Sequence, residues 1–141
     1  MITGINIYET RAYKSKLDPD KENPTIFQIG MLDPFLRAYI EDEVTSLEVS
    51  SKNPNDTAKA NIYASKRNLL AARFGLKGID NFLDPRTKKP VKFDMVSVTV
   101  NGKNYNAITE EILAMLGKAL IDELAEAILK ENTLPEEERK N

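Results

Sequence analysis

The chain has 141 residues, enough for one domain of ordinary size, and 41% of them are hydrophobic. It contains no His, Cys or Trp, which excludes imidazole acid–base chemistry, thiolate nucleophiles and thiolate zinc sites. Enzymes that work through paired carboxylates need none of these residues, so an enzyme of that kind stays open as an alternative. The composition favours a non-catalytic binding or assembly protein, for which we predict no catalytic residues, no metal site and no cofactor.

The charge balance argues against two classes of partner. Twenty basic and 22 acidic residues give a net charge of −2, whereas nucleic-acid binding normally needs clustered Lys and Arg. The longest apolar run, residues 112–121, is interrupted by Lys118 and falls short of the ~20 residues of a membrane span. The first residues also lack the basic and apolar regions of a signal peptide. We therefore expect a cytoplasmic protein with no nucleic-acid or membrane partner.

The first third of the chain predicts a β-hairpin followed by a helix. Residues 2–16 are rich in β-branched and aromatic side chains, with Ile5, Ile7 and Tyr13 on alternate positions, and residues 25–32 form a second apolar stretch. Residues 18–24 between them contain two prolines and predict a turn. Asp33 and Pro34 are typical of a helix N-cap and first turn, and predict a helix of about ten residues. Residues 46–56 then predict an exposed loop.

A second helix is predicted from residue 56 or 57 to residue 74, with Gly75 at its end. Residues 76–91 are predicted to be irregular. Residues 93–100 and 103–108 predict two strands joined by Asn101-Gly102, the preferred dipeptide of a type I′ turn. Thr109 is expected to cap a long helix to residue 131. Its apolar stripe consists of Leu113, Leu116, Leu120, Leu124 and Ile128.

These elements predict one α+β domain over residues 1–131. It contains two β-hairpin-like strand pairs packed with two shorter helices and a long amphipathic C-terminal helix. Residues 132–141 are charged and are expected to form a mobile tail.

Three charged clusters suggest chemistry but are better explained as solvated surface. Asp18-x-Asp20-x-Glu22 resembles the start of an EF-hand loop, yet the sixth position is not Gly and the twelfth is Ile29 instead of Glu. The carboxylates at 41–43 have no identifiable partner for metal binding. Four basic residues near 90 are too few to predict a nucleic-acid site: Arg86, Lys88, Lys89 and Lys92.

The long C-terminal helix offers the candidate partner-binding residues. Its first leucines, Leu113, Leu116 and Leu120, are better explained as core. Toward its end the apolar stripe continues beside the charged tail, where binding to another protein becomes more plausible. The predicted partner-binding residues are Leu124, Ile128, Leu129 and Leu134.

Three segments resemble the tail assembly chaperones of long-tailed bacteriophages. They are YKSKLDPDKENPTIFQIGMLDP, FGLKGIDNFLDPRTKKPVKF and IDELAEAILKENTLPEEERKN, which cover about half of the chain. The resemblance implies a non-catalytic protein that acts in the host cytoplasm and binds the tape-measure protein, the tail-tube protein, or both. Self-association into a homo-oligomer is left open. The alternative is a structural virion component of the capsid, neck or tail.

Overall fold

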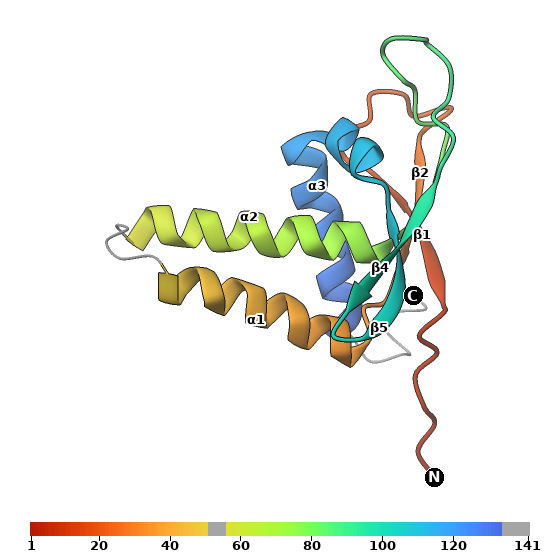
Figure 1. Cartoon of the computed structure of the whole chain (residues 1–141). Coiled ribbons are helices and arrows are strands. Elements are labelled where there is room, and N and C mark those ends of the chain that lie inside the picture. The colour runs from red at the N-terminus through yellow and green to blue at the C-terminus, as the bar shows by residue number, and fades with distance from the viewer. Residues whose placement is uncertain (51–55, 134–141) are drawn as a thin grey trace.

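The computed structural model describes the backbone of residues 1–50 and 56–133, and the side chains of residues 1–45 and 62–131. In chain order its elements are β1 (Thr10–Lys14), β2 (Ile26–Gly30), α1 (Pro34–Ser50), α2 (Asp56–Gly75), β3 (Leu76–Asp80), β4 (Met95–Val100), β5 (Lys103–Ile108) and α3 (Glu110–Thr133). The chain has the predicted α+β architecture, with a long C-terminal helix. Figure 1 shows α1 and α2 lying side by side and projecting away from the strands.

The first hairpin is part of a three-stranded antiparallel sheet in the order β1-β2-β3. Tyr13 lies opposite Phe27, and Phe27 lies opposite Ile79 on the other side. The prediction that residues 76–91 are irregular is wrong for β3, which begins directly after α2. This strand has a weak sequence signal because it has only five residues, with Gly78 at its centre.

The first helix is longer than predicted. Asp33 caps it as expected, since its Oδ1 accepts a hydrogen bond from the Leu36 N–H at 2.8 Å. The helix has 17 residues instead of about ten, so residues 46–50 of the predicted loop are helical. Residues 51–55 of that loop lie outside the described residues.

The second hairpin agrees with its prediction. Asn101 and Gly102 have positive φ angles of 50° and 82°, as a type I′ turn requires. Val100 and Lys103 face each other at the turn, and the pairing extends to Met95 and Ile108.

The C-terminal helix is not continuous. Thr109 caps its start, accepting a hydrogen bond from the Ile112 N–H at 3.3 Å, but Gly117 has φ 77° and ψ 163° and breaks the helix into two segments. Such a backbone is essentially restricted to glycine. The helix extends to Thr133, beyond the predicted boundary at 131. Of the predicted tail, residues 134–141 lie outside the described part of the chain.

The core lies where the three-stranded sheet, α2 and α3 meet, and it continues onto α1 and β5. Its largest fully buried side chains come from six elements: Phe27, Ile29, Ile40, Phe74, Leu76, Ile108, Leu124 and Ile128. Aromatic rings join the layers, because Phe74 packs edge-on against both Tyr39 and Tyr105.

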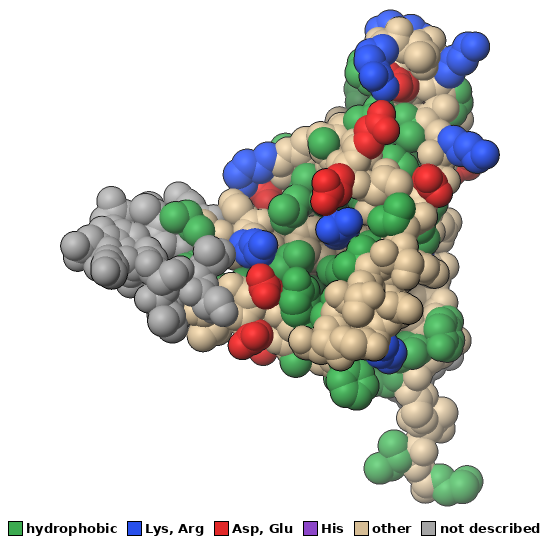
Figure 2. All heavy atoms as spheres, in the orientation of Figure 1, with side chains coloured by type: hydrophobic (Ala, Val, Ile, Leu, Met, Phe, Trp, Pro, Cys, Tyr) green, Lys and Arg blue, Asp and Glu red, His purple; other side chains and the backbone are tan. Residues whose placement is uncertain are grey.

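The start of the chain does not form the predicted strand. Pairing begins only at Thr10, whereas Ile5 and Ile7 are 57% and 39% exposed. The chain turns at Asn6, whose side-chain oxygen accepts a hydrogen bond from the Tyr8 N–H at 3.0 Å. Residues before this turn extend away from the body of the molecule (Figure 1), and Figure 2 shows apolar side chains at their end.

Candidate functional site

Two of the four predicted partner-binding residues are in the core. Leu124 and Ile128 have 0% exposure, so the prediction that they form an exposed binding face is wrong for this fold. The side chain of Ile128 packs against the backbone of Gly75 at the end of α2. Leu129 is half-buried. Leu134 lies outside the described residues.

The leucines assigned to the core are placed much as expected. Leu113 and Leu116 are buried, and Leu120 is partly buried against the same cluster. The helical period identified the apolar residues correctly, but Leu124 and Ile128 of the predicted partner face pack into the core, where Ile128 meets Gly75 of α2.

Leu129 lines an open groove of about 1140 Å³ formed by β1, α2 and the second half of α3. We call it the α2–α3–β1 groove. Small-molecule sites usually enclose about 300–1,000 Å³, so an open groove of this size suits a segment of another macromolecule. Its lining residues are Arg11, Tyr13, Lys16, Arg67, Asn68, Asp122, Glu123, Glu126, Ala127, Leu129, Lys130 and Glu131.

Glu123 holds β1 against α3 in this groove. Its carboxylate accepts hydrogen bonds from the Tyr13 hydroxyl at 2.7 Å, the Lys16 N–H at 2.8 Å and the Ser15 hydroxyl. Burial would raise the pKa of Glu123, but the three hydrogen bonds outweigh it and lower the pKa below its ordinary value. Burial, followed by the bond to Glu123, raises the pKa of Tyr13 to about 12.

Two further contacts fix the walls of the groove. Asp122 accepts hydrogen bonds from Asn68 of α2 at 3.0 Å and from Lys118 at 2.7 Å, and these bonds lower its pKa. Arg11 of β1 forms an ion pair with Glu131 near the end of α3 at 3.2 Å. The groove is therefore held open by contacts among three elements, which favours a preformed binding surface.

Two carboxylates of the groove do not have the raised pKa that a general acid needs. A carboxylate acting as general acid near neutral pH needs a raised pKa, whereas the pKa values of Asp122 and Glu123 are lowered. Ala127 and Leu129 supply apolar surface between basic and acidic side chains. This arrangement fits an amphipathic segment with charges of both signs.

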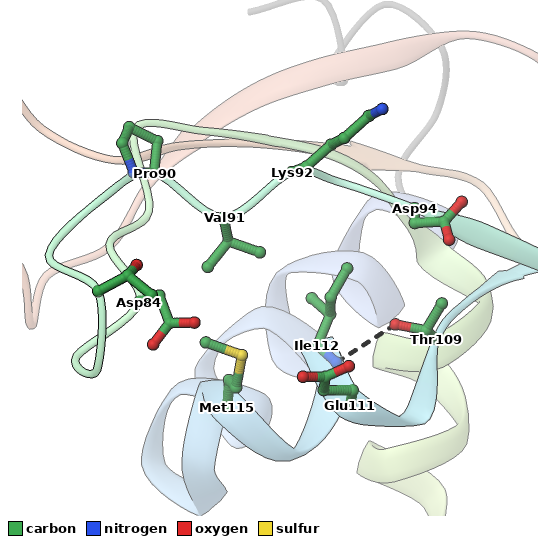
Figure 3. Close-up of a pocket in the computed structure, with 10 residues that line it drawn as sticks. Asp84, Pro90, Val91, Lys92, Asp94, Thr109, Glu111, Ile112 and Met115 are labelled. Carbon is green, nitrogen blue, oxygen red and sulfur yellow. Dashed lines mark hydrogen bonds between the residues drawn. The ribbon is translucent and has the colours of Figure 1, made fainter.

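A smaller pocket of about 490 Å³ lies between the 84–94 loop and the start of α3. Figure 3 shows Val91 of the loop pointing toward Ile112 and Met115 of α3. Backbone hydrogen bonds stabilise the loop from within, including Val91 N–H to the Phe82 carbonyl at 2.6 Å. We interpret the pocket as the seam where the loop packs on α3.

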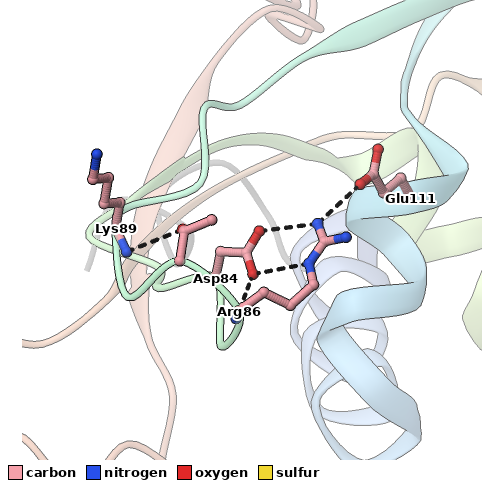
Figure 4. Close-up of polar contacts among 5 residues, drawn as sticks. Asp84, Arg86, Lys89 and Glu111 are labelled. Carbon is pink, nitrogen blue, oxygen red and sulfur yellow. Dashed lines mark hydrogen bonds and ion pairs between the residues drawn. The ribbon is translucent and has the colours of Figure 1, made fainter.

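The basic cluster beside this pocket is partly neutralised. Arg86 forms ion pairs with Asp84 at 3.1 Å and with Glu111 of α3 at 3.5 Å (Figure 4). The hydrogen bond from Arg86 lowers the pKa of Asp84. Since this guanidinium already has two carboxylate partners, the cluster fits the predicted solvated loop better than a phosphate site.

The Asp18–Glu22 segment also forms the predicted turn. Asp18 accepts backbone hydrogen bonds from Asp20 at 2.9 Å and Thr25 at 2.7 Å, so its oxygens organise the chain between β1 and β2. Among the described residues, no group of three or more acidic side chains is arranged to hold a metal ion.

Comparisons with known protein families, with curated proteins and with solved structures each found no match. The resemblance to tail assembly chaperones therefore stays a prediction. Within the described part of the chain, none of the helices has the length and apolar character needed to cross a membrane.

Most residues of the groove carry no local signal in the sequence. Tyr13 and Ser15 lie 110 and 108 positions from Glu123, so no local spacing connects them. Leu129 is the lining residue that the sequence predicts to bind a partner.

Proposed function

We propose that this chain is a non-catalytic assembly protein that holds an amphipathic segment of another protein in the α2–α3–β1 groove. The observation that carries the proposal is the groove itself, whose walls are fixed by hydrogen bonds and whose apolar surface includes Leu129. An amphipathic helix would place its apolar face on Leu129 and Ala127 and its charges on the rim.

The specific form of the proposal is a tail assembly chaperone acting in the host cytoplasm. A tape-measure protein has long apolar helical stripes that aggregate when uncovered, and a preformed groove with charges of both signs would cover part of such a stripe. The segments quoted above support this choice of partner. The tail-tube protein is the second partner in the proposal.

The test is co-expression with the tape-measure protein from the same genome, using a matched pair of variants. Leu129→Glu places a charge on the apolar surface of the groove. Leu83→Glu makes the same change at a leucine that is 54% exposed and lies outside the groove. We expect the wild type and Leu83→Glu to keep the tape-measure protein soluble and to co-purify with it, and Leu129→Glu to lose at least about tenfold in binding.

Equal loss or equal retention by the two variants would exclude the groove as the binding surface. Absence of binding by the wild type would refute the chaperone proposal. Mass spectrometry of purified particles separates the alternative, because a structural virion component would be present in many copies, whereas a chaperone would be absent.

A further inference from the structure

β4 is an unprotected sheet edge. Proteins usually protect edge strands with charged residues, prolines or bulges, because exposed backbone groups otherwise pair with another chain. β4 has the sequence MVSVTV, which contains none of these residues. In the described part of the chain its only hydrogen-bonded neighbour is β5, which is also the one element against which it packs extensively.

The other edges differ from β4. β1 carries the exposed side chains of Arg11 and Lys14. β3 carries Lys77 and Asp80, and its pairing with β2 is irregular at Ile29. β5 lies against α2 and β3. Each of them is therefore protected by charge, irregularity or packing.

The register of the hairpin identifies which backbone groups of β4 are free. Val100 and Lys103 flank a two-residue turn and form a hydrogen-bonded pair. Since such pairs alternate along an antiparallel ladder, Val96 and Val98 also point toward β5. The Thr109 N–H donates to the Asp94 carbonyl at 3.4 Å, as this alternation requires.

The backbone groups of Met95, Ser97 and Thr99 therefore point outward. The Met95 N–H donates to the side chain of Asp94 at 2.9 Å. The backbone groups of Ser97 and Thr99 and the Met95 carbonyl are left facing the open edge.

The chain also contains a segment suited to pair with that edge. We define the arm as residues 1–6, MITGIN, which precede the turn at Asn6. It has no charged side chain, and three of its six residues are β-branched. Ile2 is 100% exposed and Ile5 is 57% exposed, and the arm extends away from the body of the molecule (Figures 1 and 2).

The arm and the β4 edge are compatible in charge. Neither segment carries a charged side chain, so pairing would not bury a charged side chain without a partner. In this structure the arm does not pair with β4 of its own chain, which points to a second copy as the occupant.

We infer that the arm of one copy adds as a strand to the β4 edge of a second copy, so that the protein self-associates by strand addition. Ser97 and Thr99 of one copy supply backbone donors and acceptors to the arm of the other. Ile2 and Ile5 of the arm become partly covered. This association involves no residue that lines the α2–α3–β1 groove.

Cysteine cross-linking tests the pairing directly, because the chain has no native cysteine. Thr3→Cys labels the arm, and Ser97→Cys labels the edge. We expect a short bismaleimide to join the two single variants when they are mixed, well above the level at which either variant joins to itself. If the Thr3→Cys/Ser97→Cys double variant forms a cross-link only within one chain, and no cross-link forms between chains, the arm folds onto the edge of its own chain. That result would overturn the inference.

The second measurement is sedimentation velocity of the full chain over a concentration series. Ser97→Pro removes the outward N–H without removing a bond to β5, and Ser97→Ala retains that N–H and serves as the matched control. We expect Ser97→Pro to raise the dissociation constant about tenfold or more, and Ser97→Ala to leave it unchanged. Circular dichroism checks that both variants fold.

A monomer at every concentration would overturn the inference, as would equal dissociation constants for folded Ser97→Pro and Ser97→Ala. Leu129→Glu should self-associate like the wild type. A failure of the groove proposal is therefore distinguishable from a failure of strand addition.

Discussion

Gly75 and Ile128 form the contact that joins the end of α2 to α3. A Cβ atom at Gly75 would lie 2.5 Å from Cγ2 and 2.8 Å from Cδ1 of Ile128, whereas carbon atoms in contact are usually about 3.5–4.0 Å apart. Ile128 has 0% exposure, so it has little room to move. Gly75→Ala should therefore strain the core, although alanine is the better helix former.

The size of the effect follows from two opposing terms. Overpacking costs about 1–3 kcal/mol, and replacing a helical glycine by alanine returns up to about 0.5–1 kcal/mol. The close distances place the strain toward the upper end, so we expect a net loss of about 2 kcal/mol in the free energy of unfolding. Ile128→Ala should cost about 2–5 kcal/mol, because it leaves a cavity in the core.

The double variant separates this contact from general damage. Ile128→Ala removes all three atoms that a Cβ at Gly75 would meet. In that background Gly75→Ala should be neutral or stabilising by up to about 1 kcal/mol, which gives a coupling energy of about 2–3 kcal/mol between the two sites.

Urea unfolding followed by circular dichroism would measure the free energy for the wild type, both single variants and the double variant. Additive effects, within about 0.5 kcal/mol, would refute the contact. If Ile128→Ala unfolds with the same free energy as the wild type, Ile128 does not lie in the core and becomes a candidate surface residue again.

Three further substitutions test other features of the fold. Gly117→Ala should cost about 1–3 kcal/mol in urea unfolding because φ 77° and ψ 163° are strained for alanine; no loss would mean that α3 is straight at this point. Gly102→Ala should lower the free energy of unfolding by about 1–2 kcal/mol, because Gly102 has a φ of 82°. In this variant, amide hydrogen exchange should become faster in β4 and β5 but not in β1. Glu123→Gln should destabilise the protein by about 1–3 kcal/mol at pH 7. Because the folded-state pKa of Glu123 is lowered, its contribution is present above the unfolded pKa of about 4.3 and is lost as the pH falls through the folded value. The gap between wild type and Glu123→Gln should therefore close in acid, and a constant gap would contradict the hydrogen-bonded carboxylate.

Signals confined to a few residues predicted their elements well. Asn101-Gly102 predicted the turn, and residues 103–108 form the expected strand. Asp33 and Thr109 cap their helices as expected. In each case the side chain or the backbone angle acts within about four residues, so the sequence contains all the necessary information.

Features that depend on tertiary packing have no local signal in the sequence. β3 is short and contains Gly78, so its own residues favour a strand only weakly. It forms a strand because β2 pairs with it. The break at Gly117 was hidden because the leucine spacing continues across it, and a glycine inside a helical pattern is often tolerated. The contacts of Glu123 join residues that are more than 100 positions apart.

The candidate site shows the same limit at the level of single residues. Leu124, Ile128 and Leu129 belong to one apolar stretch of α3, and hydrophobicity alone treats them alike. Packing separates them, because the first two are buried in the core and Leu129 lines the groove. A periodic pattern identifies apolar residues, whereas the neighbouring element decides which of them remain available to a partner.

The groove and the β4 edge have different consequences for assembly. They share no residue, so a second copy on the β4 edge would leave the groove of each copy available. If both proposals hold, strand addition would repeat the groove along an oligomer, and a long helical partner could occupy several grooves at once. Linked sites can raise avidity by a factor of roughly 10²–10⁴ over a single site when the geometry allows simultaneous binding. Ser97→Pro should then weaken binding to a long partner much more than binding to a single helical segment, whereas Leu129→Glu should weaken both.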